Sequence, residues 1–187
     1  MSSQYALLGQ RRFAALFWTQ FLGAANDNVF KFAFTLLATY HAAEWGGLAP
    51  DRVGFVIGAI FIVPYVLFSA TSGQLADKFD KGRIMRLVKT LEIVIMAVAA
   101  WGFLAKNAAA LYSCVFLMGC HSTLFGPVKY AYLPQHLDEH ELTGGNGLVE
   151  MGTFVAILLG TMAGGILVKT GPEGPLYVTI ATLSIAV

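Results

Sequence analysis

The chain has 187 residues, of which 57% are hydrophobic and 12% charged, and its formal net charge is +1. A mean hydropathy of +0.66 excludes an ordinary soluble domain, and the small net charge does not indicate a nucleic-acid partner. The two cysteines, Cys114 and Cys120, lie in one apolar stretch, so we expect neither a disulfide framework nor a metal site there.

A helix needs about 20 apolar residues to cross a bilayer. Six stretches are predicted as membrane-spanning helices, at residues 13–40, 53–76, 84–105, 109–133, 146–168 and 176–187. The connections between them are short, and no soluble domain or low-complexity linker separates them. The last stretch is too short to cross, so we expect a fragment cut inside the sixth helix. The predicted fold class is an all-α membrane protein.

The first span contains polar residues near its middle. Asp27 lies between Asn26 and Asn28, and Lys31 follows one helical turn later. Ionisable groups cost a few kcal/mol inside a membrane, so each is a functional candidate. Asp27 and Lys31 have the i, i+4 spacing of an internal ion pair. However, one lysine cannot satisfy all the donors and acceptors of this run, which favours a polar ligand or a water-filled cavity.

A basic hinge, residues 73–83, connects the second and third spans. We expect a tight turn at the membrane surface, with Gly82 relaxing the backbone. Lysine and arginine accumulate in cytoplasmic loops. Seven basic residues fall on the side of the membrane where the hinge lies, namely Arg11, Arg12, Lys78, Lys81, Arg83, Arg86 and Lys89. Three fall on the other side, namely Arg52, Lys106 and Lys169. This difference predicts a cytoplasmic N-terminus.

The fourth span contains Lys129 two residues after Pro127. A proline inside a helix frees a backbone carbonyl, and a lysine beside such a break suits an anion, phosphate in particular. Alternatively, Lys129 extends to the lipid headgroups. Glu150 enters the fifth span at a similar depth, so a Lys129–Glu150 pair is expected. His121, earlier in the fourth span, is interpreted as a hydrogen-bonded packing residue.

Small residues recur at a spacing of four in the fifth span, at Gly152, Ala156, Gly160 and Gly164. They predict a smooth helix face that a neighbouring backbone can approach closely. The second span repeats this pattern and also predicts a face for close helix packing. The residues that form the pattern are Gly54 and Gly58, followed by Ser69 and Gly73.

One pattern typical of soluble enzymes occurs at residues 136–140, which read H-x-x-E-H. In inverzincin proteases this spacing supplies zinc ligands and a base. Here it follows Pro134 in a predicted short loop, residues 134–145, with no domain to supply a third ligand. We therefore expect a surface loop, no metal and no enzymatic activity in this segment.

Several motifs occur in chain order and together resemble one family. They are A-N-D-N at 25–28 with Lys31, the hinge at 73–83, F-G-P-V-K-Y at 125–130, N-G-L-V-E at 146–150 and I-L-L-G-T-M-A-G-G at 157–165. This set resembles the bacterial lysophospholipid transporter family of the major facilitator superfamily. It looks closest to members fused to acyltransferase and acyl-carrier-protein-synthetase domains.

The resemblance implies the N-terminal six-helix half of a twelve-helix transporter in the bacterial inner membrane. It further implies energy-independent flipping of lysophosphatidylethanolamine-like lipids, by alternating access, for re-acylation. The cavity-lining first helices of the two inverted repeats are then spans 1 and 4. Asp27 would take the ammonium and Lys129 the phosphate, with Asn26, Asn28, Lys31 and Glu150 as further site residues. No cofactor is implied.

For the hinge, the resemblance implies a conformational latch. Asp77 would cap the start of a helix from the other half of the transporter, and so hold one state of the cycle. The residues assigned to this latch are Gly73, Asp77, Lys81, Gly82 and Arg83. The implied partners are the lysophospholipid, membrane lipids, the missing C-terminal half and a fused or associated acyltransferase.

Two alternatives remain open at the level of sequence. The first is a proton-coupled exporter of drugs or small metabolites, with Asp27 or Glu150 as the protonation site. The second is a membrane part that only anchors an attached acyltransferase and feeds it with substrate.

Overall fold

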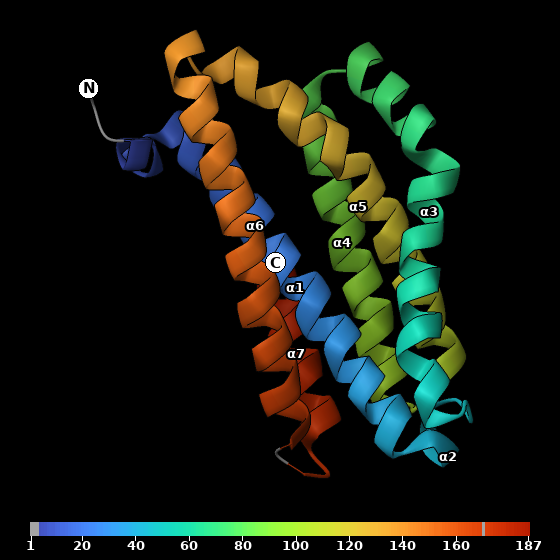
Figure 1. Cartoon of the computed structure of the whole chain (residues 1–187). Coiled ribbons are helices and arrows are strands. Elements are labelled where there is room, and N and C mark those ends of the chain that lie inside the picture. The colour runs from blue at the N-terminus through green and yellow to red at the C-terminus, as the bar shows by residue number, and fades with distance from the viewer. Residues whose placement is uncertain (1–3, 170) are drawn as a thin grey trace.

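The computed structural model describes residues 4–169 and 171–187, and within them it contains helices but no strand (Figure 1). Residues 1–3, at the N-terminus predicted to be cytoplasmic, and Thr170 lie outside the described residues. The elements are η1 (Gln4–Gly9), α1 (Arg11–Tyr40), α2 (Ala42–Trp45), α3 (Pro50–Lys78), α4 (Lys81–Leu104), α5 (Ala108–His136), α6 (Glu139–Lys169) and α7 (Gly174–Ala186).

The predicted all-α membrane class is confirmed. The stretch Ala42–Lys78 and helices α4, α5 and α6 are long and apolar enough to cross a membrane. Helix α1 is equally long, but its middle carries the polar run around Asp27. The η1 segment and the α3–α4 and α5–α6 connections lie together at one end of the bundle, which we call the hinge end (Figure 1). The opposite end, with α2 and the α6–α7 connection, is the far end.

The predicted loop at residues 134–145 is wrong, because α5 and α6 extend through it and leave only Leu137 and Asp138 between them. The first turn of α6 is stabilised by Glu141, which accepts a hydrogen bond from the Asp138 backbone N–H at 3.1 Å and binds Arg12 at 2.8 Å. Pro134 lies in the last turn of α5 without ending the helix.

The hinge is also shorter than predicted. Only Phe79 and Asp80 separate α3 from α4, and Gly82 has no positive φ, so it does not relax a turn. The connection is instead stabilised by Asp80, whose side chain accepts a hydrogen bond from the Arg83 N–H at 2.9 Å. This is the usual role of aspartate at a helix N-cap.

The α1–α6 interface brings two backbones into close contact, as the small-residue pattern of the fifth span predicted. A Cβ atom at Gly160 would overlap the Ala25 backbone, and one at Gly164 would lie 2.7 Å from the Val29 carbonyl oxygen. The helices run side by side along this contact (Figure 1). The second predicted stripe behaves differently, because Gly54, Gly58 and Gly73 have open space around them within the described residues.

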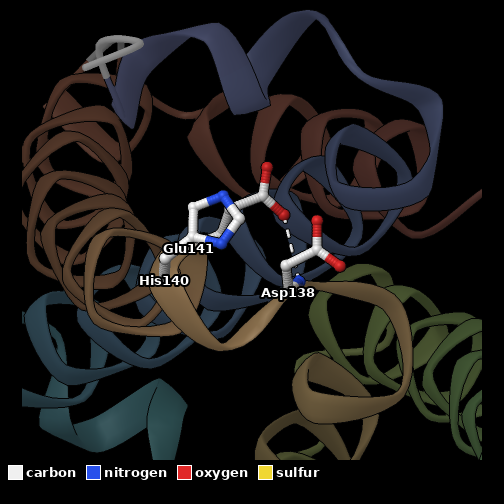
Figure 2. A group of neighbouring side chains, drawn as sticks. All are labelled: Asp138, His140 and Glu141. Carbon is white, nitrogen blue, oxygen red and sulfur yellow. Dashed lines mark hydrogen bonds between the residues drawn. The ribbon is translucent and has the colours of Figure 1, made fainter.

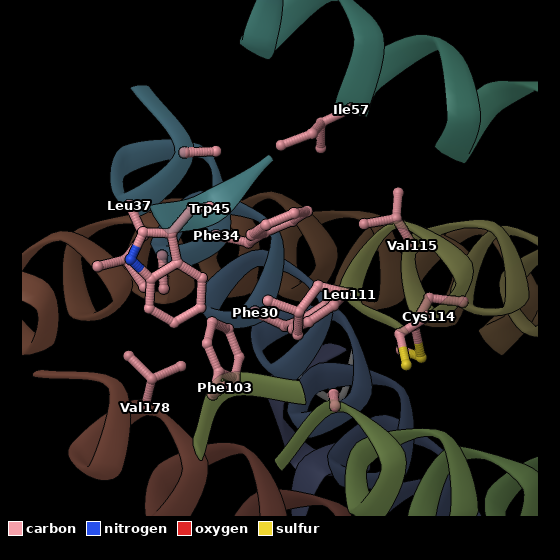
Figure 3. Close-up of a cluster of buried hydrophobic side chains, with 14 of the residues drawn as sticks. Phe30, Phe34, Leu37, Trp45, Ile57, Phe103, Leu111, Cys114, Val115 and Val178 are labelled. Carbon is pink, nitrogen blue, oxygen red and sulfur yellow. The ribbon is translucent and has the colours of Figure 1, made fainter. Parts of the chain in front are cut away.

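Two apolar clusters fill the bundle at its ends. The far-end cluster contains Phe30, Phe34 and Phe103 around Trp45 (Figure 3). The hinge-end cluster joins η1 to α1, α5 and α6 through residues that include Leu7, Phe13, Phe17, Leu133 and Leu148. Between the two clusters, α1, α4 and α5 bury polar side chains instead, among them Gln20, Asn26, Asp27, Glu92, His121 and Thr123. This polar layer contains the candidate site.

Candidate functional site

A cavity of about 330 Å³ opens inside the polar layer, and we call it the central cavity. Helix α1 supplies one wall, and α3, α4, α5 and α6 supply the others. Its lining residues are Gln20, Gly23, Ala24, Asp27, Asn28, Lys31, Phe61, Tyr65, Lys89, His121, Ser122, Phe125, Gly126, Lys129, Tyr130, Thr153 and Ile157. Four of the six predicted substrate residues therefore face one space: Asp27, Asn28, Lys31 and Lys129.

Asp27 is buried, and only one of its oxygens has a partner. The Ser122 hydroxyl donates to Oδ2 at 2.9 Å, whereas Oδ1 has no hydrogen-bond partner among the described residues. Leaving a buried acceptor unsatisfied is costly. An unsatisfied carboxylate oxygen on a cavity-lining residue is suited to receive a cationic or hydrogen-bond-donating group of a ligand.

The ion pair that the i, i+4 spacing of Asp27 and Lys31 allows does not form in the described part of the chain, and both residues line the central cavity, which is the alternative that the sequence favoured. The Lys31 ammonium lies 3.6 Å from the centroid of the Phe61 ring on α3. This cation–π contact holds it across the cavity. The i, i+4 spacing made the pair possible, but Ser122 and Phe61 on other helices compete for its two members.

The two asparagines beside Asp27 point to different places. Asn28 lines the cavity and donates to the Ala24 carbonyl at 2.7 Å. Asn26 is fully buried behind the cavity wall and donates to Glu92 Oε1 at 3.0 Å. Asn26 therefore supports the cavity wall and does not line the cavity.

Glu92 is the centre of a buried polar network that the sequence did not predict. It is 1% exposed, and its Oε2 accepts a hydrogen bond from Lys89 Nζ at 2.6 Å. Room for this contact comes from Gly23 on α1, where a Cβ atom would lie only 2.5 Å from Lys89 Nζ. The i, i+3 spacing of Lys89 and Glu92 inside an apolar span was the signal that could have predicted the pair.

His121 lies in the same network. Its Nε2 is 3.4 Å from Glu92 Oε2, within ion-pair range, yet neither ring nitrogen makes a hydrogen bond among the described residues. His121 is therefore buried as a packing residue is, but its polar contact is this approach to Glu92 and not a hydrogen bond of regular geometry. The ring is buried against α4 and also lines the central cavity.

The expected pair between Lys129 and Glu150 is confirmed, with an N–O distance of 3.4 Å. The Tyr130 hydroxyl also donates to Glu150. The Lys129 side chain is 13% exposed and Glu150 is 43% exposed, so the lysine lines the cavity while the glutamate lies outside its lining. Lys129 therefore does not extend freely to the headgroups. A lysine has three donors, so this pairing leaves capacity for an anion.

The residues assigned to the latch lie at the hinge end. Gly73 and Asp77 are in the last two turns of α3, and Lys81, Gly82 and Arg83 begin α4. Asp77 is exposed, and no hydrogen bond or ion pair of its carboxylate is found within the described residues.

The H-x-x-E-H pattern does not assemble a protease site. Asp138, His140 and Glu141 lie close enough for their ligand atoms to fall within 4.8 Å of one another (Figure 2). However, Glu141 is engaged by Arg12 and by the Asp138 backbone, so it acts in capping α6. His136 is not part of this group, and its Nδ1 lies 3.0 Å from the Tyr132 carbonyl oxygen.

A larger cavity of about 800 Å³ lies at the far end. Its lining includes Leu36, Trp45 and Val168, and its cationic Lys106 is paired with Glu44. No predicted site residue lines it, and none of the described unsatisfied buried atoms belongs to its lining. The central cavity is therefore the candidate site.

Comparisons with known proteins found one family model and a group of similar curated proteins. The family model that matches, over residues 16–187, is that of the Major Facilitator Superfamily. Similar curated proteins are named lysophospholipid transporter LplT. The protein from Enterobacter sp. (strain 638) is 36% identical over 79% of this chain and 34% of its own length. The protein from Escherichia fergusonii is 36% identical over 82% of this chain and 36% of its own length. The protein from Salmonella heidelberg is 37% identical over 79% of this chain and 34% of its own length.

The chain therefore spans about a third of the length of these relatives. No solved structure matches.

Proposed function

Because the chain belongs to the major facilitator superfamily, we propose that it forms part of a transporter that moves lysophospholipids across the bacterial inner membrane by alternating access. The observation that carries this proposal is the central cavity, which presents a buried, half-satisfied carboxylate and cationic side chains to one space. The names of the similar proteins support the same substrate class.

The chemistry of the cavity suits a zwitterionic headgroup. Asp27 Oδ1 receives the ammonium, while Lys129 and Lys31 contribute positive charge for the phosphate. Asn28 adds polarity to the wall, and Asn26 and Glu150 act through Glu92 and Lys129. A volume of about 330 Å³ is at the small end of ligand sites, so it accommodates the headgroup while the acyl chain extends toward apolar surroundings.

The orientation follows from the distribution of Lys and Arg. The hinge end, including the N-terminus, faces the cytoplasm. Helices α1 and α5 then begin the two inverted three-helix repeats of this half, and the C-terminal half completes the transporter. Delivery to the inner leaflet supplies substrate to a fused or associated acyltransferase.

The hinge residues form the latch in this proposal. The exposed, unpaired Asp77 is available to cap a helix of the second half, together with Gly73, Lys81, Gly82 and Arg83. Asp77→Asn is expected to slow turnover while lysolipid affinity stays within a few-fold. Loss of binding at normal expression would contradict the latch.

The decisive test is lysophosphatidylethanolamine uptake by the complete protein carrying Asp27→Asn or Lys129→Gln, at matched membrane levels. Losing one charge-assisted contact is worth about 1.5–3 kcal/mol, so we expect uptake to fall roughly tenfold or more. Asp51→Asn, an exposed acid in the first turn of α3, is the matched control. Near-normal uptake by both cavity variants would reject the headgroup assignment, and no uptake by the unchanged protein would reject the function.

The proton-coupled exporter keeps one supporting observation, because the unbonded His121 lies between Glu92 and the cavity. Transport assays in vesicles with and without a proton gradient distinguish the two functions. Lysolipid transport that is independent of the gradient supports the flippase, whereas gradient-driven efflux of other solutes without lysolipid transport supports the exporter.

A further inference from the structure

A second space adjoins the central cavity on its hinge-end side, and we call it the hinge-end groove. It measures about 230 Å³ and lies between α1, α4 and α5. Its lining residues are Ala15, Leu16, Thr19, Gly82, Met85, Arg86, Lys89 and Tyr132. Lys89 lines the central cavity as well, so one ammonium group faces both spaces.

The position of Lys89 is set by neighbours on three helices. Glu92 on α4 holds its Nζ at 2.6 Å, Gly23 on α1 leaves room for it, and the Phe125 ring on α5 lies 5.6 Å away. Its side chain remains 24% exposed. Because an ammonium has three donors and Glu92 accepts only one of them, Lys89 retains donors for an anion.

Arg86 provides a second cation on the same face of α4. It precedes Lys89 by three residues, which places it just under one helical turn, or about 4.5 Å of rise, nearer the hinge end. Its guanidinium makes no hydrogen bond or ion pair within the described residues, although it lines the groove. The remaining walls are mostly apolar or small, apart from Thr19 and Tyr132.

Resting on the proposed function, we propose that the hinge-end groove is a second phosphate site, where the phosphate of a lysophospholipid passes between Lys89 and Arg86 as it moves between the central cavity and the hinge-end surface. An arginine fork binds phosphate in bidentate fashion, which suits Arg86 to this position. Glu92 keeps Lys89 paired after the phosphate leaves, so the ammonium group is not left buried without a counter-charge.

Occupancy of the groove is measured directly by cysteine protection. Thr19→Cys is introduced into the complete protein lacking its native cysteines, and its reaction with a thiol reagent is timed. Lysophosphatidylethanolamine is expected to slow labelling several-fold, and a monoacylglycerol with the same chain to leave it unchanged. Protection by inorganic phosphate but not by lysolipid would overturn the lipid assignment, and equal protection by monoacylglycerol would overturn the phosphate assignment.

The role of Arg86 is tested with Arg86→Gln, its charge-retaining counterpart Arg86→Lys, and Arg11→Gln as a control outside both cavities. Arg86→Gln is expected to lower lysolipid uptake about fivefold, while the affinity for lysolipid at the central cavity stays within about twofold. Arg86→Lys is expected to restore uptake, because it retains the positive charge. Uptake equal to that of Arg11→Gln would overturn the proposal while leaving the proposed function intact. An unchanged protein that transports no lysolipid would instead reject that function.

Discussion

Helix α1 has two faces that pack by opposite means. Toward α6 it presents bare backbone at Ala25 and Val29, against which Gly160 and Gly164 lie in direct contact. Toward α4 and α5 it presents Asn26 and Asp27, which meet charged and polar side chains.

The difference separates contacts that are complete from contacts that leave polar atoms without a partner. The α1–α6 interface relies on close packing, which is a main source of helix association where lipid removes the hydrophobic driving force. The polar face is incomplete, because Asp27 Oδ1 and both His121 nitrogens lack hydrogen-bond partners among the described residues. One face therefore fixes the bundle, and the other is the face to which we assign the substrate in our proposal.

The largest effect is expected from breaking the packed face with Gly160→Leu. The side chain would collide with the Ala25 backbone, which cannot yield as a flexible side chain would. Overpacking costs about 1–3 kcal/mol or more, so we expect strongly reduced folded protein and a lower melting temperature in detergent. Gly147→Leu on the same helix, where space is open, is the control. Equal losses in both variants would contradict a backbone contact at Gly160.

A smaller effect is expected from Glu92→Gln on the polar face. The substitution removes the charge that pairs with Lys89 inside the bundle, at a cost of about 1–2 kcal/mol, below that of a fully buried pair because Lys89 is partly exposed. Thermal unfolding measures this loss, and lysolipid uptake should fall with it. Glu44→Gln removes an exposed partner of Lys106 and is expected to leave the melting temperature unchanged. Equal melting temperatures of the two variants would show that the buried network around Glu92 adds no more stability than an exposed ion pair does.

The smallest effect is expected from Gly23→Ala, which tests how α1 accommodates the network. The new methyl group would displace Lys89 Nζ, and this flexible end can move at little cost to stability. We therefore expect an unchanged melting temperature but a few-fold change in lysolipid uptake. Gly147→Ala provides the comparison. A large loss of stability in Gly23→Ala would show that the Lys89–Glu92 contact is structural only.

The sequence predicted much of the fold because apolar length and the spacing of small residues are local properties. Long apolar runs identified the spanning helices, and the glycine spacing of α6 predicted its close packing. The sequence also singled out Asp27 and Lys129 as candidates, because an ionisable residue within an apolar run is visible without any structure, and both residues line the central cavity. The pairing of Lys129 with Glu150 followed from similar depth on adjacent helices.

Only the tertiary structure determined which polar side chains contact one another. Asp27 and Lys31 satisfied the helical spacing of a pair, yet Ser122 on α5 and Phe61 on α3 bind them separately. The sequence likewise did not show that Lys89, Glu92 and His121 converge behind Asp27. Spacing along one helix determines which groups can meet within it, whereas contacts between helices depend on rotation and packing that no single segment specifies.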